Sequence, residues 1–313
     1  MGGGKGGVGK TFVTANLALA LAREGRRVVA VDTDVEGANL HTWLGVPLPA
    51  VSLADFVSGR VSDAARLITA TGIPELDLLA ATHAPLATES PAAKQRSILL
   101  QSLRQLPCDF VLMDCGAGAH TATVDYFLAG EGGLLVFHPE PSSMENAYAF
   151  LRAALYRHME QAVQKIEPRE RVREAMDPRN EHGIRTPPQL LAVLRQMDPE
   201  DARRAEESLR QFRPRLVVNE IEGPEDVTLG FQVRKMCQSR FGIEADYIGY
   251  INRDDAVRDA IRRRKPLLDL HPDSAAATCL KRIARKLGDA PDERPATKPV
   301  RPAPLAHAGE TGA

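Results

Sequence analysis

The stretch Gly4-Lys5-Gly6-Gly7-Val8-Gly9-Lys10-Thr11 lies at the start of the chain and decides the fold. It fits the pattern GxxxxGK[ST], in which glycines let backbone N–H groups wrap around a phosphate. Lys10 is expected to reach the β and γ oxygens of a nucleoside triphosphate, and the Thr11 hydroxyl to ligate Mg²⁺. The stretch therefore predicts a triphosphate site that uses every residue from Gly4 to Thr11.

The residues after this loop give it the context that such a loop needs. Residues 12–24 (FVTANLALALARE) place apolar side chains at helical spacing and end at Gly25, so they predict a helix that opens on the phosphate. A flexible glycine-rich start is the alternative, and this helix argues against it. Residues 27–31 (RVVAV) then predict a buried parallel strand.

Three carboxylates follow apolar runs, at the strand ends where ligands of parallel sheets bind. Asp32 and Asp34 end the run at 27–31, and Asp114 ends the run at 109–113 (DFVLM), before the turn-like residues 115–118. We expect Asp32 and Asp114 in the outer shell of the metal, and Asp34 to orient the attacking water. A solvated acid at a strand end is the alternative for each.

The rest of the chain alternates between strand and helix patterns. This alternation predicts an α/β fold with a mostly parallel, doubly wound sheet of the P-loop NTPase type and helices on both faces. An insertion over about 160–213 interrupts it; this segment is charged, rich in proline and helical at 188–197 and 199–212. The predicted strands are 27–31, 76–80, 109–114, 133–138, 215–219 and 244–250.

Composition narrows the class of protein. With 313 residues, 43% of them hydrophobic and 26% charged, the chain can bury one large core. We expect one domain over 1–288 and a disordered tail rich in Pro and Ala over 289–313. The four cysteines form no CxxC pair and no apolar run reaches the roughly 18 residues of a membrane span, so a cytoplasmic location is predicted.

The motifs resemble those of the deviant Walker A ATPases, which include MinD, ParA and the flagellar-number regulator FlhG. The resemblance rests on KGGVGKT at 5–11 and DTDVEGANLH at 32–41. The segments DCGAGAH at 114–120, HPEPSSMENAY at 138–148 and YIGYINRDDAVRDAIRRRKPLLDLHPDS at 247–274 are most similar to the FlhG branch. The resemblance covers roughly residues 2–160 and 213–288.

The resemblance implies an ATP- and Mg²⁺-dependent switch. In the family the second lysine of the loop, matched by Lys5, reaches the phosphates of the partner subunit's ATP, so the chain is expected to form an ATP-dependent homodimer. Lys5, Lys10 and Asp34 would act in a slow, partner-stimulated hydrolysis, and Asn219 would lie beside the adenine. The dimer would recruit a protein partner to position or regulate a flagellum or motility apparatus, a chromosome or a division site.

Two other classes of ATPase compete with this interpretation. An iron–sulfur carrier of the Mrp kind would need a cysteine pair, which the sequence lacks. A biosynthetic ligase of the dethiobiotin synthetase kind would carry a small-molecule pocket in place of partner recruitment. The second lysine and the FlhG-like segments argue against the ligase.

Two basic segments do not decide whether such a switch would work on a membrane or on DNA. Residues 275–288 combine an apolar stripe (Cys279, Leu280, Ile283 and Leu287) with basic residues, so they could lie on the inner membrane face or pack as the last helix of the domain. The basic run from Arg258 to Lys265 could contact DNA of the nucleoid or form a solvated surface.

A P-loop normally follows a central buried strand, and here only Met1 to Gly3 precede it. Five buried apolar residues contribute roughly 8 to 15 kcal/mol, as much as the net stability of a whole domain. We therefore expect that the natural chain begins upstream with an apolar strand, the first central strand of the sheet. Mass spectrometry of the protein purified from its source tests this, and an N-terminal peptide that starts at Met1 or Gly2 would contradict it.

Overall fold

Parallel strands in two sheets form the centre of the molecule. The computed structural model describes residues 1–35, 37–81, 92–130, 133–177 and 179–289, in which the sheets have the orders β2-β3-β1-β4 and β5-β6-β7. All pairs are parallel except β2 with β3. The strands are β1 Val28–Asp32, β2 Ile68–Ala70, β3 Leu76–Leu79, β4 Phe110–Asp114, β5 Leu134–Phe137, β6 Arg215–Ile221 and β7 Asp246–Asn252.

The predicted single sheet is divided between β4 and β5. Among the described residues these two strands are joined through the residues just before the P-loop: Cys115 N–H donates to the Met1 carbonyl at 3.0 Å, while Gly2 donates to Leu134 and accepts from Val136. The P-loop thus starts from a segment that is hydrogen-bonded to both sheets. The short antiparallel strand β2 was not predicted.

Successive residues of the strands enter two different cores. In β1 all five residues are buried, with Val29 and Val31 in one hydrophobic cluster and Val28 and Ala30 in the other. Side chains of a strand alternate between the faces of a sheet, so a strand whose residues are all buried needs helices on both sides. The predicted doubly wound α/β architecture is confirmed.

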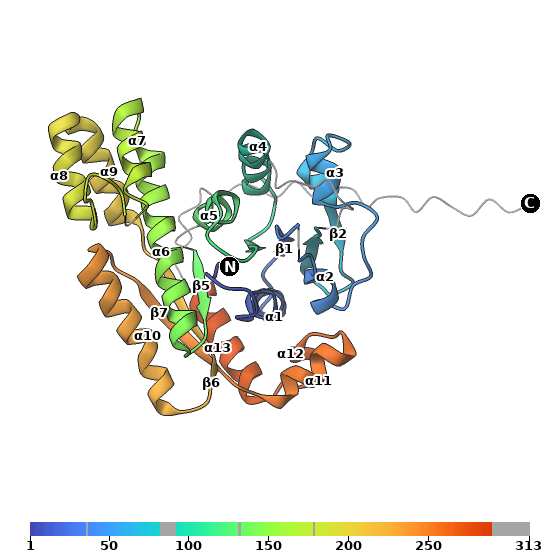
Figure 1. The fold of residues 1–313 in the computed structure, drawn as a ribbon. Helices are drawn as coiled ribbons and strands as arrows, with labels where there is room; N and C mark the ends of the chain where they lie inside the picture. The colour runs from blue at the N-terminus through green and yellow to red at the C-terminus, as the bar shows by residue number, and fades with distance from the viewer. Residues whose placement is uncertain (36, 82–91, 131–132, 178, 290–313) are drawn as a thin grey trace, which may run out of the picture.

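Helices cover both faces of the sheets (Figure 1). One face carries α1 Lys10–Arg23, α2 Leu40–Trp43, α11 Asp255–Arg263, α12 Leu267–Leu270 and α13 Ala275–Gly288. The other carries α3 Leu53–Val57, the 3₁₀ turn η1 Ala64–Leu67, α4 Ala93–Arg104, α5 Thr121–Leu128, α6 Pro141–Ala162, α10 Pro224–Met236 and the π turn η2 Cys237–Phe241.

Residues 166–211, within the predicted insertion, form α7 Ile166–Glu174, α8 Pro187–Met197 and α9 Pro199–Gln211. Local signals set the helix starts: Thr186 and Gln189 form a capping box before α8, and the Asp198 carboxylate accepts the N–H of Asp201 at the start of α9. Figure 1 shows these helices at one end of the molecule, next to α6.

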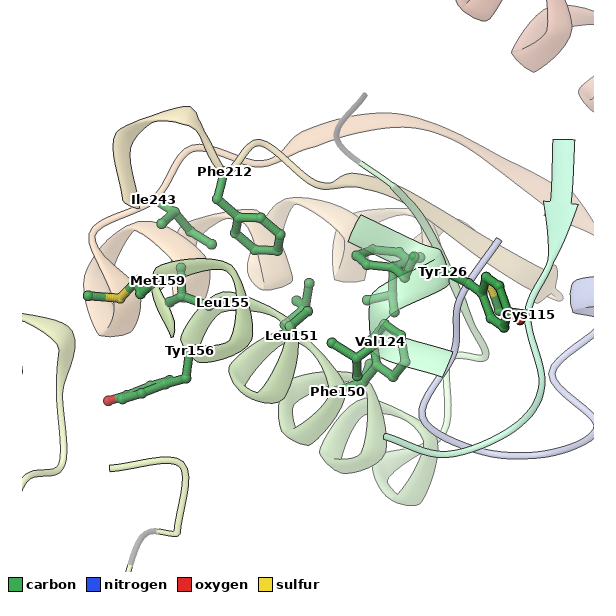
Figure 2. Packing of buried hydrophobic residues seen from close by; sticks show 14 of the residues in the cluster. Cys115, Val124, Tyr126, Phe150, Leu151, Leu155, Tyr156, Met159, Phe212 and Ile243 are labelled. Carbon is green, nitrogen blue, oxygen red and sulfur yellow. The ribbon is translucent and has the colours of Figure 1, made fainter. Parts of the chain in front are cut away.

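The long helix α6 joins this group to the main core. Figure 2 shows Phe150, Leu151 and Leu155 along α6, with Val124 of α5 beside Phe150 and with Phe212, which follows α9, above Leu151 and Leu155. All five are buried in one hydrophobic cluster. The helices of 166–211 therefore share a core with the sheet.

A buried arginine of α6 holds the end of α7. Arg152 is 7% exposed, and its guanidinium donates to the carbonyls of Ala175 at 2.8 Å, Arg185 at 3.0 Å and Met176 at 3.4 Å. The same group lies 4.8 Å from the ring centre of Tyr156. The positive charge is thus compensated by carbonyl dipoles at a helix C-terminus and by an aromatic face.

The predicted tail lies outside the described residues, apart from Asp289. Within the described part of the chain, none of the helices combines the length and the apolar character needed to cross a bilayer.

Arg152→Ala is expected to lower the free energy of unfolding by about 3 kcal/mol, because it leaves buried carbonyls without donors. Urea unfolding followed by circular dichroism measures this. The matched control is Arg203→Ala on α9, whose ion pairs with Glu200 and Glu207 are exposed and worth less than about 1 kcal/mol. Equal losses for the two variants would contradict a holding role for Arg152.

Candidate nucleotide-binding site

The P-loop runs directly into the N-terminus of α1. Gly9 precedes the helix with φ +87°, a left-handed conformation that favours glycine. A Cβ at Gly9 would lie 2.3 Å from Asn219 Nδ2, and one at Gly4 would lie 2.0 Å from the Asn146 carbonyl oxygen. These two glycines therefore let the loop pass closely against β6 and α6, with the free N–H groups of α1 at its end.

Lys10 and Thr11, the polar residues at the start of α1, are held toward the loop and β4. Lys10 is 7% exposed, and its ammonium donates to the backbone carbonyl of Lys5 at 3.4 Å, which places the charge inside the curve of the loop. The Thr11 side chain forms a hydrogen bond with Asp114. Thr14, one turn further along α1, lies with its hydroxyl 3.4 Å from Asp114 Oδ1.

Asp32 and Asp114 lie side by side because β1 and β4 pair in register. Asp32 is 1% exposed and Asp114 is 2% exposed. Burial, and then repulsion from Asp114, raise the pKa of Asp32 to about 8. Burial also raises the pKa of Asp114 to about 6, against the opposing effect of the Thr11 hydrogen bond and the Lys10 charge. A bound divalent cation is the charge that would let both ionise.

Backbone N–H groups fix the orientation of Asp32. Its Oδ1 accepts from Asp34 at 3.0 Å, and its Oδ2 accepts from Asn39 and Leu40 at 3.1 Å each. Asp32 thereby anchors both ends of the segment that carries Asp34, and the beginning of α2 with it. The Asp34 Oδ1 accepts the N–H of Gly37 at 2.8 Å.

A cavity of about 470 Å³ opens above these elements. The predicted site residues that line it are Gly6, Gly7, Gly9, Lys10, Thr11, Asp34 and Asn219. Asn219 is 3% exposed, and its amide donates to the Val8 carbonyl at 3.1 Å. The cavity lining does not include Gly4, Lys5, Val8, Asp32 and Asp114. The two aspartates are buried at the strand ends, and Lys5 is exposed.

Part of the lining was not predicted. Residues 251–255 comprise the last two residues of β7 and the three that follow it. The rule that ligands bind at strand ends could have found them, as it did Asn219 of β6. Phe12 and Trp43 gave no such signal, because an aromatic residue on a helix is most often part of a core. Val257, Arg258 and Ile261 of α11 complete this part of the lining.

The two basic segments differ in their surroundings. The apolar stripe of α13 packs inside the domain, where Cys279, Leu280 and Ile283 are buried, so it is not available to a lipid surface. At the end of α11, Arg262, Arg264 and Lys265 are exposed.

Asp32→Asn is expected to reduce the pH dependence of stability in the protein without nucleotide and metal. In the folded protein Asp32 holds a proton at a pH where the unfolded chain, with a pKa of about 3.9, has released it. The free energy of unfolding therefore falls as pH rises from about 4 to about 8. The decrease is up to about 1.4 kcal/mol per pH unit for each proton that the folded state retains and the unfolded state has released. Urea unfolding with a chelator between about pH 5 and about pH 8 measures this slope.

Asp109→Asn is the matched control, because its hydrogen bond with Arg27 lowers the pKa of Asp109. Asp109 is then ionised in the folded and the unfolded state throughout this pH range, so its removal should leave the slope unchanged. A wild-type slope in Asp32→Asn would contradict the assignment.

Comparison with known proteins identifies the family. The model of the CobQ/CobB/MinD/ParA nucleotide binding domain matches residues 1–267. Antiactivator FleN of Pseudomonas aeruginosa is 28% identical over 92% of this chain and 85% of its own. Septum site-determining protein MinD of Helicobacter pylori is 33% identical over 46% of this chain and 53% of its own.

The solved structures agree in fold. MinD of Pyrococcus horikoshii, described in complex with Mg-ADP, has a TM-score of 0.59 at 22% identity and covers 92% of this chain and 94% of that one. The resemblance found in the motifs is confirmed, and the chain belongs to the CobQ/CobB/MinD/ParA family of nucleotide-binding domains.

Proposed function

We propose that this chain binds ATP with Mg²⁺ in the 470 Å³ cavity and hydrolyses it as a molecular switch. The observation that supports this most directly is that the P-loop, Asp34 and Asn219 converge on one cavity although they lie far apart in the sequence. The residues suit the ligand: glycines with no room for a Cβ, a helix N-terminus, a buried ammonium group and two carboxylates that need a cation.

Each residue then has a distinct role. The N–H groups from Gly6 to Thr11 and the Lys10 ammonium would hold the phosphates, and the Thr11 hydroxyl would ligate Mg²⁺. Asp32 and Asp114, held at the strand ends, would accept hydrogen bonds from waters of the metal. Asp34 would orient the attacking water. The metal supplies charge neutralisation of the phosphates when bound.

Lys5 would act between two subunits. Its side chain is exposed and does not line the cavity of its own subunit, whereas its carbonyl accepts from Lys10. An exposed lysine within the phosphate-binding loop suits a contact with the ATP of a second copy. Nucleotide would thus control the formation of a homodimer.

The likeness to FleN over most of both chains favours a regulatory role over a metabolic one. We infer a cytoplasmic switch whose ATP-bound dimer recruits a protein partner and is reset by slow, partner-stimulated hydrolysis, with a flagellum or motility apparatus as the first candidate and chromosome or division-site placement as others. A contact with DNA or an anionic membrane through the exposed Arg262, Arg264 and Lys265 stays a prediction.

Light scattering with ATP and Mg²⁺ is expected to show a dimer for the wild type. The Asp34→Ala dimer should last longer, because this variant would bind ATP but would not orient the attacking water, so hydrolysis would be slower. Lys5→Ala should remain monomeric, because the second phosphate contact is lost. The matched control is Lys235→Ala, an exposed lysine on α10 away from the cavity, which should behave as the wild type.

Two results would reject the switch. The first is a wild type that stays monomeric with ATP and Mg²⁺. The second is a Lys5→Ala variant that dimerises as well as Lys235→Ala.

A further inference from the structure

A series of ion pairs that the proposed nucleotide site does not use runs through the layer of helices from α4 to α7. Arg96 of α4 binds Asp125 of α5 at 2.8 Å, and Asp125 also accepts from Arg157 of α6 at 2.8 Å. Arg157 also binds Glu160 of α6 at 2.8 Å, and Glu160 binds Arg173 of α7 at 2.6 Å. We call these five residues the ion-pair chain. Figure 1 shows α4, α5, α6 and α7 following one another across the molecule, and neighbouring helices of this series are in contact.

The two carboxylates of the ion-pair chain are buried. The side chain of Glu160 is 3% exposed and that of Asp125 is 11% exposed, whereas the Arg203 side chain, which forms ion pairs on α9, is 63% exposed. The cost of removing charges from water can exceed the energy of their attraction, so stability alone does not require ion pairs in this position. Such pairs do fix a geometry, because each carboxylate is held by two arginines.

Helix α5 connects the ion-pair chain to the cavity. It begins directly after the segment 115–120, which follows β4. Ala117 of this segment lines the cavity, and a Cβ at Gly116 would lie 3.5 Å from the Asp34 carboxylate. Because α5 has only 8 residues, Asp125 lies in its second turn. A shift of the segment 115–120 therefore reaches Asp125 over a short, rigid distance.

Helix α6 contacts the same site near its own beginning. A Cβ at Gly4 of the P-loop would lie 2.0 Å from the Asn146 carbonyl oxygen, so the loop and the first turns of α6 are in direct contact. Arg157 lies about three turns further along this helix, where its Nε donates to Asp125 and its Nη1 to Glu160. Two helices that contact the nucleotide site are thus joined by one guanidinium.

We propose that the ion-pair chain couples the nucleotide cavity to α7, so that bound ATP and Mg²⁺ hold α7 more firmly on α6. Coupling between separate sites is carried by packed side chains and ion-pair networks of defined arrangement. Nucleotide in the cavity restricts the segment 115–120 and the P-loop, and with them the positions of Asp125 and Arg157. Through Glu160 this restriction reaches Arg173, and α7 opens less often. A protein partner that binds α7–α9 would then distinguish the loaded protein from the empty one, because such coupling is reciprocal.

This inference rests on the proposed binding of ATP, and Arg157→Met tests it by cutting the ion-pair chain at its centre. Asp125 keeps Arg96 and Glu160 keeps Arg173, so neither carboxylate is left without an arginine and the variant is expected to fold. Its affinity for nucleotide should stay close to that of the wild type, because the open form of α7 is a minor state in either protein.

Hydrogen exchange of residues 166–174, measured by mass spectrometry, reports the opening of α7. It is compared with and without Mg²⁺ and the non-hydrolysable β,γ-imido analogue of ATP, whose binding calorimetry measures in parallel. In the wild type the nucleotide is expected to slow this exchange at least about fivefold, the lower end of usual coupling between sites. In Arg157→Met the nucleotide should bind and leave the exchange unchanged.

The matched control is Arg195→Met. Arg195 binds Glu206 at 3.0 Å and joins α8 to α9, outside the ion-pair chain. This variant loses an ion pair within the same group of helices and should keep the wild-type response. Arg173→Met is a second cut at a side chain that is 61% exposed, so it tests the ion-pair chain even if Arg157→Met does not fold.

The outcomes separate the coupling from the binding of nucleotide. If the wild type does not bind the nucleotide, the proposed function and the coupling are both wrong. If the wild type binds it and the exchange of α7 does not slow, only the coupling is rejected. A response in Arg157→Met or Arg173→Met as large as in Arg195→Met would also reject it, because α7 would then respond to the nucleotide by another route, such as a dimer contact.

Discussion

The hydrogen bonds from the backbone to the Asp32 carboxylate connect the end of β1 with the loop of Asp34 and with α2. Asp32 ends β1 and receives N–H groups of Asp34, Asn39 and Leu40, so one buried side chain fixes both the following loop and α2. Through the register of β1 with β4 the same carboxylate lies beside Asp114, which contacts α1. The strand ends, the loop of Asp34 and the helix of Trp43 thus form one hydrogen-bonded unit.

This arrangement places two carboxylates in a buried position, where a bound cation would lower the free-energy cost of ionising both. Desolvation disfavours a charged carboxylate, and a second one nearby adds repulsion, which is why the pKa values of both rise. A site that is strained electrostatically when empty and relieved when a metal nucleotide binds is suited to a switch.

The helices α7–α9 are supported in a different way. They share the hydrophobic core of α6, and the end of α7 is held by the buried Arg152. Their outer surface carries many ion pairs among exposed side chains, such as those of Arg203 with Glu200 and Glu207. Such a surface is solvated and contributes little to stability, so the attachment of these helices depends on α6.

The sequence alone was sufficient for the features that depend on local patterns. The P-loop, the apolar runs that end at Asp32 and Asp114, and the strand–helix alternation predicted the doubly wound fold and most of the strands, because periodicity and glycine placement act within a few residues. It was not sufficient for β2, a short antiparallel strand of three residues whose pairing with β3 depends on contact between segments.

Tertiary structure decided which of these residues meet. It brought Asn219 of β6 within 3.1 Å of the Val8 carbonyl, across 211 positions of sequence. It also left Lys5 out of the cavity lining and placed Phe12 and Trp43 in it. No local pattern encodes such neighbours, because the packing of whole helices on a sheet determines which side chains share a cavity. The sequence therefore determined the chemistry of the phosphate loop, and the fold determined the shape of the site around it.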